Sequence, residues 1–166
     1  MKGLHLCPLC PDDLSAFARW AADAEFCRAI GWRLGLDERA LRAWLAPILA
    51  GGEPGFLRLG VAWQGGLIGY VDLADLNGYS GEFGIALGER ALWGRGLGVE
   101  AGRLLLAHGF GTLGLQLIRA EVHVSNARSL RLMEKLGFVD VGTAPQLEMY
   151  RDAWTEVRCF ELRAAE

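Results

Sequence analysis

The sequence feature that most constrains the fold is a glycine-rich junction at residues 92–99, which read Leu-Trp-Gly-Arg-Gly-Leu-Gly-Val. An apolar run, Phe83-Gly-Ile-Ala-Leu87, precedes this junction, and a helical pattern that starts at Glu100 follows it. The junction therefore predicts a strand that passes through a tight loop into a helix. Backbone N–H groups at such a helix start converge on an anion, and Arg95 lies beside them, which favours a pyrophosphate as the ligand. The alternative is a glycine-rich turn that only reverses the chain.

Two common phosphate-binding motifs do not match this junction. No Gly-Lys-Ser or Gly-Lys-Thr follows the glycines, which excludes a P-loop. Gly94, Gly96 and Gly98 have the spacing GxGxG rather than GxGxxG. The downstream acid Glu121 falls early in the next expected strand, whereas a ribose-binding acid belongs at the end of that strand. We therefore expect a pyrophosphate site of another kind.

The rest of the chain alternates between strand and helix patterns, with no internal repeat and no linker. The first helix is capped by Asp12 or Asp13, and the second begins at Asp37 and is expected to fray or end at Pro47. Strands are expected at 4–9, 56–63, 67–73, 82–87, 117–124, 138–143 and 156–162, and further helices from the glycine loop to about residue 110 and at 126–136. The order β-α-α-β-β-β-α-β-α-β-β predicts one α/β (α+β) domain over residues 1–166, with a mixed sheet covered by helices on both faces.

Composition excludes several classes of function. The net charge of -3 and the pI of about 5.7 argue against a nucleic-acid surface. The apolar runs are shorter than the ~18 residues that a membrane span needs. The N-terminus lacks the layout of a signal peptide, so we expect a cytoplasmic protein. Cys7-Pro-Leu-Cys10 has the spacing of zinc and redox motifs, but no second ligand pair exists, so small buried thiols are the favoured interpretation and no metal is expected.

A second informative stretch is Glu121-Val-His-Val-Ser-Asn-Ala-Arg-Ser-Leu-Arg-Leu-Met-Glu-Lys-Leu-Gly-Phe138. Together with Trp93-Gly-Arg-Gly-Leu-Gly98, it resembles the GCN5-related N-acetyltransferase (GNAT) family. That family pairs a glycine-rich pyrophosphate loop with a downstream Asn-x-x-Ser/Ala helix that ends in Lys-x-Gly-Phe. The resemblance covers nearly the whole chain. It implies the GNAT fold, with a central mixed, mostly antiparallel sheet of seven strands and helices on both faces.

Further residues resemble one subgroup of this family, which contains the ribosomal-protein N-terminal (alanine or serine) acetyltransferases. They are Trp93, Ser129, Ile30-Gly-Trp32 and Tyr150-Arg-Asp152. The resemblance implies transfer of an acetyl group from acetyl-CoA to a primary amine, by direct attack in a ternary complex. A protein N-terminus is one acceptor that fits, and an aminoglycoside, a polyamine or an amino acid are others. A homodimer is also compatible with the resemblance.

The resemblance implies a contact set for acetyl-CoA. Loop amides would hold the pyrophosphate, the strand before the loop would pair with the pantetheine arm, and Asn126 would hydrogen-bond the same arm. Asn126 has an alternative role as a helix N-cap and could serve both. The implied contacts are Ile85, Ala86, Leu87, Trp93, Arg95, Gly96, Leu97, Gly98, Val99, Asn126 and Ser129.

The incoming ammonium must lose a proton before it attacks the thioester. Glu121 is the leading candidate base, because it stands five residues before Asn126, where some family members carry a catalytic glutamate. Glu82 is a second candidate and His123 a third, and a solvated strand face is the alternative explanation for this polar row. Many relatives carry a tyrosine acid seven residues after the asparagine, where this chain has Met133, so the Ser129 hydroxyl is the candidate to meet the thiolate.

The acceptor groove is expected at residues 24–36 and 150–154, where Asp23, Glu25 and Glu82 could attract an amine and Trp32 and Trp154 could pack against it. Two other classes of function remain open at this point. One is a related domain that binds CoA as a sensor without catalysis. Met133 is compatible with it, because it replaces the tyrosine acid of many relatives. The other is a domain that uses the glycine loop for a different phosphate.

Overall fold

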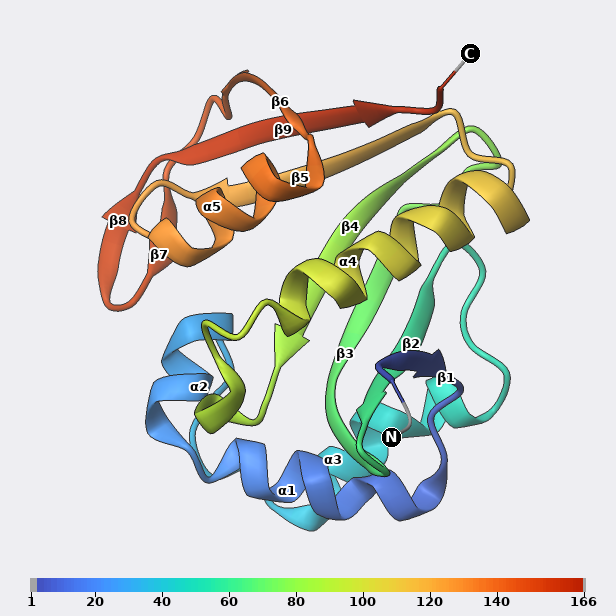
Figure 1. The fold of residues 1–166 in the computed structure, drawn as a ribbon. Helices are drawn as coiled ribbons and strands as arrows, with labels where there is room; N and C mark the ends of the chain where they lie inside the picture. The colour runs from blue at the N-terminus through green and yellow to red at the C-terminus, as the bar shows by residue number, and fades with distance from the viewer. Residues whose placement is uncertain (1–2, 166) are drawn as a thin grey trace.

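The computed structural model describes residues 3–165. Its centre is one seven-stranded sheet in the order β1-β2-β3-β4-β5-β9-β6 (Figure 1). Neighbouring strands are antiparallel except for β4 and β5, which are parallel. The strands are β1 (His5–Cys7), β2 (Leu57–Trp63), β3 (Gly66–Ala74), β4 (Ser80–Leu87), β5 (Leu117–His123), β6 (Val139–Thr143) and β9 (Val157–Arg163), and a separate hairpin is formed by β7 (Glu148–Tyr150) and β8 (Ala153–Thr155).

Helices cover both faces of the sheet, which confirms the expected fold. They are α1 (Leu14–Ala21), α2 (Ala24–Ile30), α3 (Glu38–Leu49), α4 (Leu97–Ala107) and α5 (Ala127–Leu136). Strand alternation sends successive side chains of β3 to opposite faces. Tyr70 joins the apolar cluster of α1, α2 and α3, whereas the fully buried Val71 joins the cluster of α4 and α5. Burial of each large apolar side chain in these clusters contributes about 1.5–3 kcal/mol.

The parallel pair β4–β5 opens along its length. Pairing is confined to Ser80–Glu82 against Leu117–Arg119, although β4 continues to Leu87 and β5 to His123. Figure 1 shows the two strands close together at one end and well apart at the other. The far part of β4 therefore presents a backbone edge that β5 does not cover.

Two elements were not expected from the sequence. Helix α2 has only 7 residues and is capped by Asp23, whose side chain accepts hydrogen bonds from the N–H groups of Glu25 and Phe26. The β7–β8 hairpin turns at Arg151 and Asp152, both with positive φ, and of the two only aspartate is common in such turns. Both elements are too short, or too unusual in their turn residues, to give a clear periodic signal.

The expected end of a helix at Pro47 is wrong. Helix α3 contains Pro47 and ends two residues later, at Leu49. The proline lies in the last turn, where its missing N–H removes one hydrogen bond, and Ala50 and Gly52 still donate to the carbonyl oxygens of Ala46 and Pro47. No helix within residues 3–165 combines the length and the apolar character needed to cross a membrane.

Candidate active site

The glycine-rich junction forms the start of α4. Gly96 is its N-cap with a φ of 84°, and no side chain caps the helix. Within the described residues, the N–H groups of Leu97 and Gly98 have no hydrogen-bond partner. A Cβ added to Gly94 or Gly96 would meet no atom within 4 Å, so the space above the loop is open. Free N–H groups at the positive end of a helix, beside an open space, form a site for an anion.

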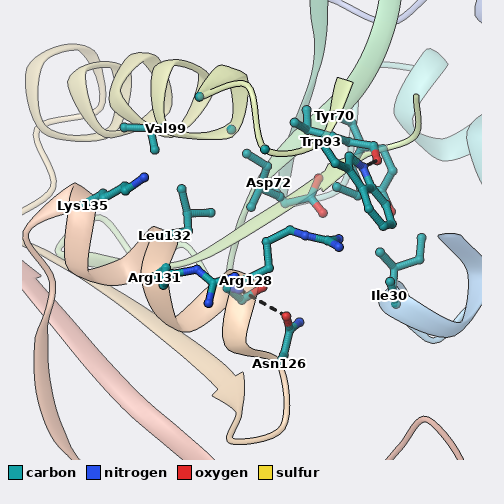
Figure 2. A pocket seen from close by; sticks show the side chains of 18 residues that line it. Ile30, Tyr70, Asp72, Trp93, Val99, Asn126, Arg128, Arg131, Leu132 and Lys135 are labelled. Atoms are coloured by element: carbon teal, nitrogen blue, oxygen red, sulfur yellow. Dashed lines mark hydrogen bonds between the residues drawn. The ribbon is translucent and has the colours of Figure 1, made fainter. Parts of the chain in front are cut away.

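A cavity of about 520 Å³ opens against this loop. It continues along the uncovered end of β4 and under the first turns of α5, as Figure 2 shows. Nine of the residues implied as cofactor contacts line it: Ile85, Ala86 and Leu87 on β4, Trp93, Gly96, Gly98 and Val99 at the loop, and Asn126 and Ser129 at α5. The volume lies within the range of about 300–1,000 Å³ that is usual for ligand pockets.

The side chains of Arg95 and Leu97, two other implied contacts, do not line the cavity. Leu97 is buried in the core, and the Arg95 guanidinium lies 5.2 Å from the centroid of the Trp63 ring. A contact of either residue with the pyrophosphate would have to use the backbone N–H, which stays a prediction.

Asn126 has the geometry for two roles at once. Its Oδ1 accepts a hydrogen bond from the Ser129 N–H at 3.1 Å, so it caps α5, and the residue also lines the cavity. The side-chain NH₂ group remains available to a ligand. Met133 lies on the opposite side of α5, is 2% exposed and packs in the core, so this position offers nothing to the cavity.

Three cations on α5 also line the cavity, and the sequence reasoning missed them. Arg128, Arg131 and Lys135 follow Asn126 at spacings that place them on one helix face. The Arg128 guanidinium lies 3.7 Å from the centroid of the Trp93 ring, and the Trp93 indole N–H donates to the Leu87 carbonyl at 2.7 Å. In Figure 2, Lys135 points toward Val99 and Arg128 crosses toward Trp93. Together with the loop, these side chains give the cavity a strongly anion-attracting wall.

Glu82 and Glu121 lie at the closed end of the β4–β5 split. The register pairs Glu82 with Arg119, and alternation along β5 then places Glu121 on the same face of the sheet. Glu82 is half-buried, and its pKa is raised mainly by burial and then by the charge of Glu121. Neither glutamate lines the cavity at the loop.

Asp72 and Tyr70 line the inner end of the cavity and were not singled out from the sequence. The Arg58 guanidinium donates to both carboxylate oxygens of Asp72, from Nε at 2.5 Å and from a terminal nitrogen at 2.6 Å. The two side chains are only 11% and 15% exposed. Burial raises the pKa of Asp72, although Arg58 acts in the opposite direction. Asp72 stands in an apolar strand pattern, where its spacing gave no signal.

The expected acceptor segments are tied together by ion pairs. Glu25 on α2 accepts from Arg151 in the hairpin at 2.7 Å, and Asp23 accepts from Arg90 at 2.6 Å. Each arginine lowers the pKa of its partner carboxyl group. His123 hydrogen-bonds Glu148 of the hairpin through Nε2 at 2.9 Å.

The two tryptophans expected at the acceptor groove differ in exposure. Trp154 is 67% exposed, whereas Trp32 packs against the aromatic cluster under α1. Across residues 3–165, no group of three or more His, Cys, Asp or Glu side chains is arranged to hold a metal ion. Cys7 and Cys10 are free thiols.

Comparison with known proteins places these features in a family. A family model described as an acetyltransferase (GNAT) domain matches residues 4–139. The alpha/beta-tubulin-N-acetyltransferase 9 of Homo sapiens is 38% identical over 74 residues, which are 45% of this chain and 35% of that protein. The uncharacterized N-acetyltransferase p20 of Bacillus licheniformis is 33% identical over 101 residues, which are 61% of this chain and 56% of that protein. The chain thus spans between about a third and just over half of the length of these curated relatives.

Solved structures agree on the fold. A spermidine N-acetyltransferase from Vibrio cholerae, in complex with CoA and spermine, matches with a TM-score of 0.84 at 22% identity, over 96% of this chain and 95% of that chain. An acetyltransferase of the GNAT family from Bacillus anthracis matches with a TM-score of 0.82 at 19% identity, over 98% and 95%. Since the family model spans well over half of the sequence, the chain belongs to the GNAT acetyltransferases, a family of N-acetyltransferases that use acetyl-CoA.

Proposed function

We propose that this chain transfers the acetyl group of acetyl-CoA to a primary amine, by direct attack in a ternary complex. The observation that carries the proposal is one continuous cavity. It joins the free N–H groups of Leu97 and Gly98 to the uncovered edge of β4. The free N–H groups suit the pyrophosphate of acetyl-CoA, and the uncovered strand edge suits its amide-rich pantetheine arm.

Each part of the cofactor then has a partner in the chain. The amides of residues 95–99 hold the pyrophosphate, and the backbone of Ile85, Ala86 and Leu87 pairs with the pantetheine arm. Asn126 donates its side-chain N–H to a carbonyl of the same arm while its Oδ1 keeps the cap on α5. Arg131 and Lys135 supply positive charge beside the phosphates.

The reaction needs one proton acceptor and no covalent intermediate. Glu121, with Glu82 as the rival candidate, takes one proton from the ammonium, and the free amine attacks the thioester carbonyl carbon. The C–S bond breaks and the electron pair leaves with the thiolate. A second proton passes from the new amide nitrogen to the thiolate, with the Ser129 hydroxyl as its donor in relay. N–H groups of β4 stabilise the intermediate oxyanion.

The acceptor is the finer part of the proposal. A protein N-terminal amine is the leading candidate, which fits the subgroup that Trp93 and Ser129 resemble and the tubulin N-acetyltransferase among the relatives. A small amine is the alternative, as in the spermidine N-acetyltransferase among the structural neighbours. The proposal includes a cytoplasmic location. Analytical ultracentrifugation would show whether the protein is a homodimer in solution.

A second candidate is a CoA-binding sensor without catalysis. The position of Met133 favours it, because that side chain is buried in the core and supplies no acid toward the thiolate.

Two measurements distinguish these functions. Acetyl-CoA should raise the melting temperature under both, because it binds only the native state. Release of free thiol with a panel of amines, including ribosomal-protein N-terminal peptides, spermidine and an aminoglycoside, is expected only of the enzyme. Binding of acetyl-CoA without thiol release from any amine would leave the sensor. No binding of acetyl-CoA at all would contradict both functions.

A further inference from the structure

The inner end of the cavity holds a carboxylate that has no part in the proposed reaction. Asp72 on β3 lines the same cavity as the glycine loop, but from the far side of β4. Figure 2 shows its carboxylate directed into the cavity near Trp93, on the side of the Arg128 side chain away from Asn126. It is also the one carboxylate that lines this cavity within the described chain.

Register places Asp72 close to the reacting end of the cofactor. Asp72 pairs with Gly84, the residue before Ile85 on β4. Gly84 has no side chain, and a Cβ there would lie 3.3 Å from the Asp72 Cβ and 3.5 Å from one of its carboxylate oxygens, so the Asp72 side chain lies over Gly84. Because the thioester end of the pantetheine arm is expected beside Ile85, Asp72 reaches toward it over Gly84, where no side chain stands in the way.

Arg58 holds this carboxylate in one orientation. The guanidinium binds both Asp72 oxygens and is itself fixed between rings, with its carbon 4.3 Å from the Trp44 centroid and 4.4 Å from the Tyr70 centroid. A carboxylate offers about four lone-pair positions, so two remain for a ligand. A rigid, half-satisfied acceptor next to a reaction centre is suited to orient an N–H donor.

Other carboxylates near the acceptor route are placed less well for this task. Glu82 and Glu121 lie at the closed end of the strand split and outside the cavity lining. Asp23 and Glu25 also lie outside the lining of this cavity. Burial of Asp72 also makes it a stronger hydrogen-bond acceptor than an exposed aspartate, in keeping with its raised pKa.

We propose that Asp72 is the docking group for the ammonium of the acceptor, and that Arg58 is its positioning residue. The inference rests on the proposed function and leaves proton removal to the glutamates. Ala29, Ile30 and Tyr70 contribute apolar and aromatic surface to the same cavity. The site therefore takes a primary ammonium carried on a compact apolar group, such as the first residue of a peptide that begins with alanine.

The test is steady-state kinetics with an alanine-initiated peptide amide, with acetyl-CoA varied separately. Asp72→Asn should raise the KM for the peptide on the order of 10- to 100-fold, because a charged hydrogen bond is lost. The kcat and the KM for acetyl-CoA should change by about threefold or less. Arg58→Lys should give an intermediate rise in the KM for the peptide, because the charge remains but the two-point hold on Asp72 is lost.

Two further variants separate docking from folding. Asp140→Asn breaks another aspartate–arginine pair, with Arg158 on the exposed sheet edge, and should leave every kinetic constant unchanged. The double variant Arg58→Met/Asp72→Leu removes the buried pair without leaving a lone charge, so it should fold and bind CoA yet keep the high KM for the peptide.

The outcomes distinguish the inference from the proposed function. An active parent enzyme whose Asp72→Asn variant keeps the parental KM for the peptide would overturn the docking role alone. Equal losses of CoA affinity and peptide affinity in the double variant would also overturn it, because they would indicate a structural role. A parent that releases no thiol with any amine would overturn the proposed function, and the docking role with it.

Discussion

The two ends of the cavity are built in different ways. At the loop end, the groups offered to a ligand are backbone N–H groups at the start of α4, exposed because Gly96 adopts a φ of 84° and no side chain covers them. At the inner end, they are side chains held by other side chains. Asp72 is held there by Arg58 of the neighbouring strand.

This difference determines what a substitution can change. A backbone site depends on local conformation, so bulk or charge at one glycine should weaken cofactor binding without affecting the acceptor. A side-chain site depends on tertiary contacts, so a change there should alter the acceptor or the proton transfer and leave the cofactor bound. Substitutions at each end of the cavity test whether cofactor binding and acceptor chemistry can be changed separately.

The largest expected effect is on proton transfer. Glu121→Gln keeps the shape of the side chain and removes its basicity, so turnover should fall by roughly 10²–10⁴-fold while the affinity for acetyl-CoA stays close to that of the parent. Stopped assays of thiol release, with calorimetry of CoA binding, would measure both. Glu134→Gln on the exposed side of α5 is the matched control, and Glu82→Gln tests the rival base. Near-parental turnover in both Glu121→Gln and Glu82→Gln would rule out a glutamate base.

The next effect concerns the backbone site. Gly98→Asp should weaken CoA binding by on the order of 100-fold, because it places a negative charge beside the pyrophosphate. Gly98→Ala is the matched control, since its Cβ would contact Leu87 Cδ1 at an ordinary 3.7 Å and the helical backbone tolerates alanine. Calorimetry should find the alanine variant within a few-fold of the parent. Equal affinities for the aspartate variant and the parent would mean that the pyrophosphate binds elsewhere.

The same contrast explains what could be predicted from the sequence. The loop was recognisable because its signal is local: alternating glycines between a strand pattern and a helix pattern. Asn126 and Ser129 were recognisable from their resemblance to the family's Asn-x-x-Ser motif, which is also local in the sequence. A mixed, mostly antiparallel sheet of seven strands with helices on both faces followed from the periodic patterns and the family resemblance.

The inner end was not predictable for a physical reason. Asp72 acquires its surroundings from Arg58 on the neighbouring strand and from rings on α3 and β3, and none of these contacts is encoded by spacing along the chain. The hairpin is a similar case, because Arg151 takes a positive φ angle that its residue type does not favour. Tertiary contacts, such as the pair between Arg151 and Glu25, hold such a turn in place.

A smaller effect separates the two roles of Asn126. Asn126→Asp keeps an oxygen to cap α5 and loses the N–H donor, whereas Asn126→Ala loses both. Both variants should bind acetyl-CoA more weakly, by about 1–3 kcal/mol for a buried carbonyl that loses its donor. Only the alanine variant should also unfold more easily, by about 1 kcal/mol for the lost cap. Calorimetry and denaturant titration measure the two quantities. Unchanged cofactor affinity in both variants would leave Asn126 as a cap alone.

The smallest expected effect is a dependence of stability on pH that comes from Glu82. Burial, followed by the charge of Glu121, raises the pKa of Glu82 in the folded protein. The fold therefore favours the protonated carboxyl group, and its ionisation destabilises the native state as the pH rises through the raised pKa.

Below the unfolded value of about 4.3, the parent and Glu82→Gln should melt at nearly the same temperature. Toward neutral pH the glutamine variant should become the more stable, by on the order of 2 °C. Melting curves between about pH 4 and pH 8 would measure the difference. A difference that stays constant with pH, or that favours the parent at neutral pH, would contradict the assignment. Glu121→Gln in the same series should remove part of the effect, because it removes the second cause of the shift but not the first.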